Sequence, residues 1–216
     1  MARMSADERR AELLAAALRV MSRDGVAAGT TRAIAAEASM VLATFHYCFR
    51  SRNELLRELI LMLTEIEREA ARAAMQPGRD IRDTLRQAID GYLEHLEQNP
   101  GHEQVLFELN HHALRTPELR DLADEQYRQY YESATVLLTT AADLAGVEWQ
   151  VEMPILARMV VTMIDGATTT WLVDHDTART RAALDVMLDY VATLTKPAKG
   201  RRPARAKSPA RMKQNA

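Results

Sequence analysis

The side chains best suited to bind a partner through hydrogen bonds lie between residues 30 and 52. This stretch opens on Thr30, Thr31 and Arg32, whose hydroxyl and guanidinium groups can donate hydrogen bonds to phosphate oxygens. The sequence contains no Gly-x-Ser-x-Gly nucleophile motif and no glycine-rich phosphate loop that would add catalysis. These residues therefore indicate binding to a phosphate-bearing polymer.

Residues 40–49 form a second short segment that combines apolar and hydrogen-bonding side chains. Apolar side chains can contact thymine methyl groups in a major groove, and a threonine hydroxyl can bond a base edge or a phosphate. The side chains expected to face DNA are Val41, Leu42, Ala43, Thr44, His46 and Tyr47, with Arg52 next to them. Because an outward Val or Leu is a poor solvent residue, we expect a partner to cover this face.

Two short helices, over residues 30–38 and 40–49, must position these side chains, and helices of this length need a neighbour to pack on. Residues 6–24 predict that neighbour, a helix that opens on a Ser5–Glu8 capping box and ends at Gly25. Ala35 permits close approach of the two short helices, and Ser39 lies in the turn between them. The side chains expected to point inward are Ile34, Ala38, Met40, Phe45 and Cys48.

Three stretches in register, residues 30–35, 38–49 and 51–56, resemble the N-terminal signature of the tetracycline-repressor (TetR) family. The resemblance covers roughly residues 10–60. It implies an Ω-shaped homodimer in which helices one to three bind DNA, helices four to seven enclose an inducer pocket, and the last two helices form a four-helix dimer interface. A ligand would then swing the long fourth helix and move the two recognition helices away from a separation of about 34 Å, one DNA turn.

The resemblance also assigns roles to individual positions of the helix-turn-helix. Thr30 and Arg32 would start the helix that lies over the DNA backbone, and Leu42, Ala43 and Thr44 would read bases. His46 takes the place of a phosphate-contacting Tyr, and Arg52 the place of a phosphate-contacting Lys.

This sequence departs from the family pattern at four positions of that motif. Ser39 stands where Gly is usual, Val41 where a capping Ser is common, Ala43 where Gly is common, and His46 replaces Tyr. The missing Ser cap costs about 1 kcal/mol at the recognition helix. We therefore expect DNA binding to a non-standard operator, with a mild pH dependence from His46.

The composition predicts an all-α fold of about nine helices, because 47% of the residues are hydrophobic and only 8 are Gly. We expect a three-helix helix-turn-helix DNA-binding domain over residues 1–50 and a larger helical ligand-binding and dimerisation domain over residues 51–195. Beyond the first three helices, caps, glycines and prolines delimit helices at residues 52–75, 80–98, 102–114, 116–144, 151–173 and 176–194. Residues 196–216 are expected to form a disordered basic tail.

Charge is distributed unevenly along the chain. Residues 1–60 hold nine Arg and seven acidic residues, whereas residues 61–195 hold eleven Arg and twenty-three acidic residues. The last 21 residues carry eight basic residues and no acid. A mildly basic front with an acidic body suits a protein that presents only its front to DNA, although ordinary surface charge would give the same totals.

The second half of the chain offers weaker indications of a pocket and an interface. Polar or aromatic residues that interrupt apolar helical faces suit a pocket for a small, apolar or amphipathic effector: Tyr92, His95, Phe107, Asn110, His111, Thr162, Asp165 and Thr169. Apolar residues of the last two helices exceed what one hairpin can bury and suit a dimer seam: Met159, Met163, Trp171, Leu184, Met187, Leu188 and Val191.

Several alternatives stay open at this stage. The outward helix could bind a partner helix instead of DNA, and a helical bundle could host an enzyme. His95, His102, His111 and His112 invite a metal, but no two of them are four residues apart. We expect no cofactor, no metal and no membrane partner. The single Cys48 and the absence of a long apolar run indicate a cytoplasmic protein.

Overall fold

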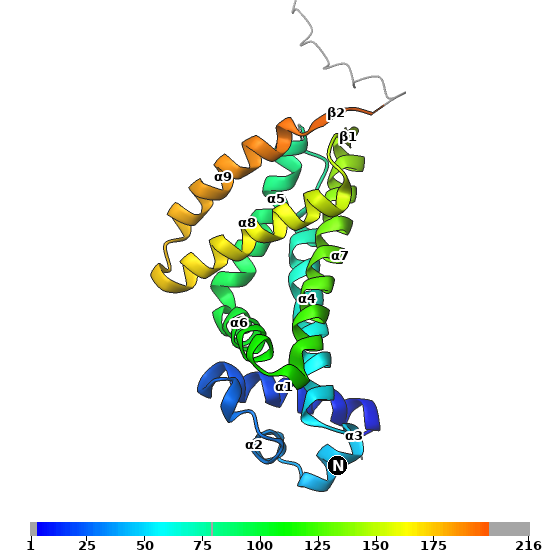
Figure 1. The fold of residues 1–216 in the computed structure, drawn as a ribbon, viewed down its shortest axis with the longest axis vertical. Helices are drawn as coiled ribbons and strands as arrows, with labels where there is room; N and C mark the ends of the chain where they lie inside the picture. Colours follow the sequence, from blue (N-terminus) through cyan, green and yellow to red (C-terminus); the bar gives the residue numbers. More distant parts are fainter. Residues whose placement is uncertain (1–3, 79, 199–216) are drawn as a thin grey trace, which may run out of the picture.

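The computed structural model describes residues 4–78 and 80–198, which form an elongated molecule built almost entirely from helices (Figure 1). One end, which we call the head (residues 4–51), contains the first three α-helices. The remaining described residues, from residue 52 on, form the body. The head comprises α1 (Ala6–Asp24), the 3-10 turn η1 (Val26–Ala28), α2 (Thr31–Glu37) and α3 (Leu42–Cys48).

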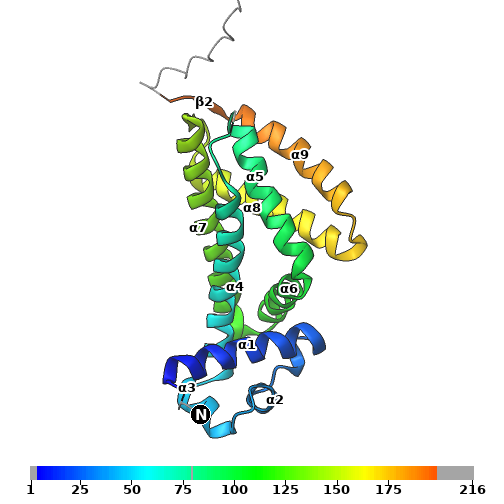
Figure 2. The same cartoon turned by 180° about the vertical axis from the view of Figure 1, so that it is seen from behind.

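The body continues with six α-helices, a second 3-10 turn and two short strands. In both views α4 and α7 run side by side along the length of the molecule, and α8 and α9 lie toward the end opposite the head (Figures 1 and 2). The body elements are α4 (Arg52–Ala74), α5 (Ile81–Gln98), α6 (Pro100–Arg115), η2 (Pro117–Leu119), α7 (Arg120–Ala145), β1 (Val147–Trp149), α8 (Met153–Asp174), α9 (Thr177–Thr193) and β2 (Thr195–Pro197).

Local capping explains why the helices begin and end where they do. The predicted capping box of α1 is present, with the Glu8 N–H donating to Ser5 Oγ at 3.1 Å. Gly146 ends α7 in the left-handed conformation, which glycine adopts without strain. The all-α expectation and the count of nine α-helices are confirmed for the described residues.

Two helix starts differ from the sequence-based expectation. Pro100 begins α6 rather than ending the helix before it, because a proline at the first helical position has no N–H to leave unpaired. Pro117 opens the 3-10 turn η2, and α7 starts only at Arg120. Both prolines act as initiators of a new helical segment.

The expected start of the tail at residue 196 was wrong. Thr195–Pro197 forms β2, which pairs antiparallel with β1 so that Lys196 lies opposite Glu148 and Pro197 opposite Val147. Backbone pairing therefore keeps the chain ordered past the end of α9. The rest of the expected tail, residues 199–216, lies outside the described residues.

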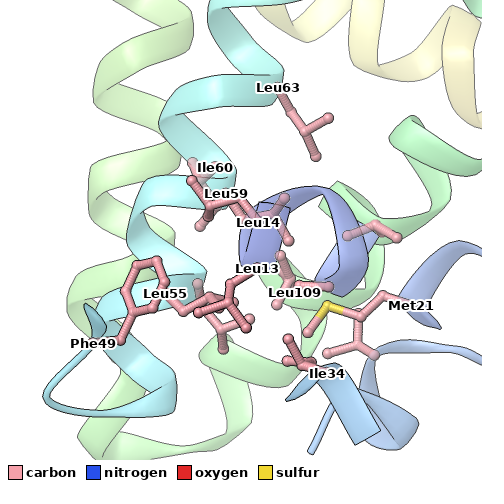
Figure 3. Packing of buried hydrophobic residues seen from close by; sticks show 14 of the residues in the cluster. Leu13, Leu14, Met21, Ile34, Phe49, Leu55, Leu59, Ile60, Leu63 and Leu109 are labelled. Atoms are coloured by element: carbon pink, nitrogen blue, oxygen red, sulfur yellow. The ribbon is translucent and has the colours of Figure 1, made fainter. Parts of the chain in front are cut away.

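The core around the head extends into the body. Leu13 and Met21 of α1 and Ile34 of α2 pack together with leucines from α4 and α6 (Figure 3). Leu55, Leu59 and Leu63 of α4 belong to the same buried cluster, as does Leu109 of α6. The packing unit of the head therefore continues past residue 50, the predicted domain limit.

Helix α6 connects the two regions by direct contacts. The Val26 N–H donates to the Glu108 carboxylate at 2.7 Å, and the Ser22 hydroxyl donates to the Gly101 carbonyl at 3.3 Å. A Cβ atom at Gly101 would lie 2.9 Å from the Ser22 Cβ atom, so only glycine allows α6 to approach α1 this closely. A displacement of α6 would therefore reach the head.

Candidate functional site

The turn between α2 and α3 sets the angle at which α3 is presented. Ser39 has φ of 54°, in the left-handed region that favours glycine, and its N–H donates to the Ala36 carbonyl at 2.9 Å. The Met40 N–H closes the turn on the Ala35 carbonyl at 2.8 Å. The turn thus requires the backbone conformation that the family's usual Gly supplies, and Ser39 adopts it with some strain.

The two helices of the motif begin differently. Thr30 caps α2, since its hydroxyl accepts a hydrogen bond from the Ala33 N–H at 3.1 Å. Val41 precedes α3 and offers no side-chain cap, as the departure from the family pattern predicted. The first N–H groups of α3 are therefore left for water or for an anionic partner.

Helix α3 presents most of its predicted DNA-facing residues to solvent. Val41 is 70% exposed and Tyr47 73% exposed, and Phe45 on the opposite side is fully buried in the head. Ala43, His46, Thr30 and Arg32 are also exposed, whereas Thr31, Leu42 and Thr44 are half-buried. The helix therefore carries a continuous outer face at the end of the molecule (Figure 1).

Arg52 is held within the head rather than extended to solvent. Its Nε donates to the Gly29 carbonyl at 2.6 Å, and one terminal nitrogen donates to the Val26 carbonyl at 2.7 Å. Burial lowers the pKa of its guanidinium. Arg52 thus closes the η1 turn, and its removal would disturb the fold as well as any phosphate contact.

The body contains a partly open cavity of about 160 Å³ between α4, α5, α7, α8 and α9, with one residue from α6. Its wall is mainly aliphatic and aromatic, including Ala134, Leu138 and Val161. Of the residues predicted for a pocket, Tyr92 and Asp165 line it. So do Met163, Leu184, Met187, Leu188 and Val191, which were predicted for the dimer interface.

Two carboxyl groups are buried at this cavity. Glu67 of α4 is 9% exposed and Glu103 of α6 is 3% exposed. The Tyr92 hydroxyl donates to Glu103 Oε1 at 2.9 Å and lies 2.6 Å from the Thr168 hydroxyl. Burial raises the pKa of Glu67 well above its ordinary value and that of Glu103 to about 7, so the pair retains a proton near neutral pH.

A third carboxyl group, that of Asp165 on α8, also lines the cavity. The Tyr127 hydroxyl donates to Asp165 Oδ2 at 2.9 Å, and burial raises the pKa of Asp165. Tyr127 also lines an open groove of about 1060 Å³ on the side of α7 and α8, which Asn110 and Arg68 help to form. The Tyr127–Asp165 hydrogen bond therefore lies between the groove and the cavity.

The other residues predicted for the pocket do not reach the cavity. The Thr162, Thr169 and His111 side chains bond carbonyls of their own helices on exposed faces. His95 stacks toward His102, with ring centroids 5.5 Å apart, and Phe107 faces His111. A polar residue within an apolar stretch is thus a weak signal, because one residue of shift rotates a side chain by about 100°.

Glu67 and Glu103 are site residues that the sequence reasoning missed. A usable signal was present, because Leu63, Thr64, Glu67 and Ala71 follow helical spacing and are all buried in α4. Glu103 lies in the same way on the buried side of α6. An acidic residue within the apolar stripe of a helix would therefore have predicted these two buried carboxyl groups.

The residues predicted for the dimer interface lie inside the protomer. Helix α8 packs on α7, and α9 packs on α5. Four of the predicted residues are buried and three are partly buried: Trp171, Leu184, Leu188 and Val191, and Met159, Met163 and Met187. The exposed apolar residues of the two helices are Ile155, Val173, Val186 and Tyr190.

Neither a metal cluster nor a membrane helix is found in the part of the chain that the structure describes. No three or more His, Cys, Asp or Glu side chains there are arranged to hold a metal ion. No helix among the described residues is long and apolar enough to cross a membrane.

The fold and the outer face of α3 define a regulator with a helix-turn-helix at one end and a helical body with a cavity. Residues 13–59 match the family model of bacterial regulatory proteins of the tetR family, and residues 81–196 match the C-terminal model of BetI-type transcriptional repressors. The chain therefore belongs to the TetR family of transcriptional regulators. The expected resemblance is confirmed.

Individual relatives agree over nearly their whole length. The HTH-type nicotine-responsive transcriptional repressor HdnoR of Paenarthrobacter nicotinovorans is 28% identical over 188 residues, 87% of this chain and 95% of that protein. The multidrug binding protein EbrR, solved with imidazole, is 26% identical, with a TM-score of 0.64 over 89% of this chain and 98% of its own. A transcriptional regulator of Rhodococcus sp. Rha1 shares the fold at 16% identity, with a TM-score of 0.69, over 86% of this chain and 97% of that one.

Proposed function

We propose that the chain is a repressor that binds a palindromic operator as a homodimer and releases it when a small molecule enters the cavity. The observation that carries the proposal is the position of α6. One of its residues, Glu103, lines the cavity, and two others, Gly101 and Glu108, contact the head. A ligand that displaces α6 would therefore act on the head that holds α3.

The outer face of α3 supports DNA as the partner. It places the exposed Val41 and Tyr47 beside the Thr44 hydroxyl, within reach of base edges and phosphates once α3 lies in a major groove. If operator DNA is the partner, the protein acts in the cytoplasm, where the DNA lies. The relatives named as a nicotine-responsive repressor and a multidrug binding protein support a small-molecule effector.

The outer side of α8 and α9 supports a homodimer. Ile155, Gly166 and Val173 follow one stripe along α8, and Val186 and Tyr190 are exposed on α9. A Cβ atom at Gly166 would meet no other atom within 4 Å, so this position is open in the protomer. We infer that Gly166 lets a helix of the partner approach α8, in place of the buried residues predicted from sequence.

Light scattering of the purified chain tests this interface. Gly166→Leu leaves the protomer unhindered but blocks close helix approach, and Val186→Asp places a charge in the seam; both should yield monomers and weaken operator binding. Val136→Asp on α7, also exposed, is the matched control and should remain dimeric. Dimers of unchanged stability in both variants would exclude this seam.

Operator DNA selected from a random pool by the protein itself tests the partner. We expect an affinity that falls steeply with salt, because phosphate contacts release counterions. Failure to enrich any sequence, or enrichment without salt dependence, would contradict DNA binding and favour a partner helix on α3.

A further inference from the structure

We propose that the cavity binds a small organic cation with an apolar body, whose positive charge pairs with the negative charge that remains on the Glu67–Glu103 pair. The inference rests on the proposed function, since it names the chemistry of the effector for the same cavity. Three observations support the inference: the charge of the cavity wall, polar atoms in that wall without a hydrogen-bond partner, and the volume of the cavity.

Three of the four charged residues that line the cavity are acidic. Glu67, Glu103 and Asp165 come from three different helices and line the same space. Arg68 is the only basic side chain among the described residues of the wall, and its guanidinium pairs with Glu65 on the outer side of α4. The protein thus supplies three carboxyl groups with no cation of its own directed at them.

Two polar atoms of the wall have no hydrogen-bond partner among the described residues. They are Oε1 of Glu67 and Oγ1 of Thr64, one helical turn apart on α4, and both are buried. A buried carboxyl oxygen without a partner is costly, because it has lost its hydration and gained nothing in exchange. A bound group that carries positive charge would compensate that loss.

Other ligand classes fit the wall less well. An anion would be repelled by the acidic wall, and a neutral apolar molecule would leave Glu67 Oε1 without a hydrogen-bond partner. A bare metal ion lacks a site, because no three acidic, His or Cys side chains of the described residues are arranged to hold one. An organic cation, in contrast, matches both the acids and the aliphatic remainder of the wall.

The size and the aromatic residues of the cavity narrow the class further. A volume of about 160 Å³ is close to that of an engineered cavity of about 150 Å³ that holds benzene. Tyr92 and Tyr130 form part of the wall, and aromatic rings attract organic cations. We therefore expect a cation with about one ring or an equivalent aliphatic body.

Isothermal titration calorimetry of the full-length protein tests the charge preference. The probes are benzyltrimethylammonium, the smaller phenyltrimethylammonium, neutral neopentylbenzene, which has the shape of the first, and anionic 3-phenylpropanoate. We expect at least one cation to bind at about 1 mM or tighter, and at least tenfold more tightly than the neutral and anionic compounds.

Variants locate the bound cation. Glu67→Gln and Glu103→Gln keep the shape of the wall but each removes one of the two paired carboxyl groups, and each should weaken cation binding at least tenfold. Asp165→Asn should weaken it less, because Asp165 is not part of the Glu67–Glu103 pair and its carboxylate accepts a hydrogen bond from Tyr127. Glu69→Gln is the matched control, since Glu69 lies exposed on α4 and pairs with Arg72. Circular dichroism checks that each variant folds, and Asp165→Asn provides the charge test if either glutamine variant fails to fold.

The outcomes separate this inference from the proposed function. Equal or tighter binding of the neutral or anionic probe would overturn the cation and leave a ligand cavity in place. No cation binding at about 1 mM, or binding that survives Glu67→Gln and Glu103→Gln, would also overturn it. The operator selection does not depend on these titrations. If the protein selected no operator, that result would count against the proposed function and not against the cation.

Discussion

The head and the body bury different kinds of side chain. In the head, every buried side chain that the structure describes is apolar, as Leu13, Ile34 and Phe45 illustrate. All the buried polar residues of the described chain lie in the body, among them Thr64, Glu67 and Glu103. The comparison indicates that the head is built for a fixed shape that displays α3, whereas the body keeps polar groups inside for a molecule that is not part of the chain.

The largest expected change in stability comes from a substitution in the core of the head. Phe45→Ala should destabilise the protein by about 3–5 kcal/mol, because it opens a hole in a fully apolar core. In the body, Glu67→Leu should leave stability unchanged or raise it, since it replaces a buried acid, one of whose oxygens has no hydrogen-bond partner, by an apolar side chain. Urea denaturation measures both changes. Equal losses of unfolding free energy in the two variants would show that the body core tolerates substitution no better than the core of the head.

A pH series sharpens the contrast. The pKa of Glu103 is raised from 4.5 to about 7 in the folded state, so folding takes up a proton between these values. Its favourable contribution is present below pH 4.5 and is lost as pH rises through about 7, by at most about 3 kcal/mol. Glu103→Gln should therefore lose less stability than the wild type between pH 5 and 8.

The comparison of variants measures Glu103 together with its effect on the pKa of Glu67, which Glu103 helps to raise. Glu67 and Asp165 shift in the same direction as Glu103, whereas burial lowers the pKa of His95 and His102, which opposes the trend. Asp165, His95 and His102 remain in both proteins. Thermal unfolding of the wild type, Glu103→Gln and the exposed-site control Glu69→Gln gives the difference, and parallel pH curves would rule out a raised pKa at Glu103.

On α3, Thr44→Ala and Tyr47→Ala should each weaken operator binding about tenfold without lowering the melting temperature. The first removes a hydroxyl and the second an exposed ring, each expected to touch DNA. Thr139→Ala, on an exposed face of α7, is the matched control. Unchanged fluorescence anisotropy titrations for both α3 variants would remove this surface from the DNA interface. Arg52→Ala serves less well, because Arg52 also closes the η1 turn.

The smallest expected effect concerns the start of α3. Val41→Ser supplies the missing cap and should stabilise the head by about 1 kcal/mol, which thermal unfolding detects as a small rise in melting temperature. Val136→Ser, in the middle of α7, should give no such rise. A loss of stability in Val41→Ser would mean that the valine packs against the head, contrary to its exposure.

The sequence predicted the head better than the body for a physical reason. The signals in the head are local: helix caps, the Ser39 turn, and the inward positions of Ile34, Ala35 and Phe45. The structure follows these signals. The cavity depends on where five helices cross, which no local pattern records. Tyr92 and Asp165 were found because they interrupt apolar stretches, but the same rule selected His111 and Thr162, which face outward.

The interface residues show the same limit. Leu184, Leu188 and Val191 share a helical face, and the sequence alone does not decide whether that face meets the protomer or a second copy. In the structure it meets the protomer. The strand β2 was missed because three residues of pairing leave no periodic pattern.

The most direct test of a head controlled by the body is operator affinity measured with and without the cation. Fluorescence anisotropy with the selected operator should show a dissociation constant that rises at least tenfold for the wild type when the benzyltrimethylammonium site is saturated. The dissociation constant of Glu103→Gln should not change at that concentration. The same operator affinity for the wild type with and without a bound cation would contradict the account.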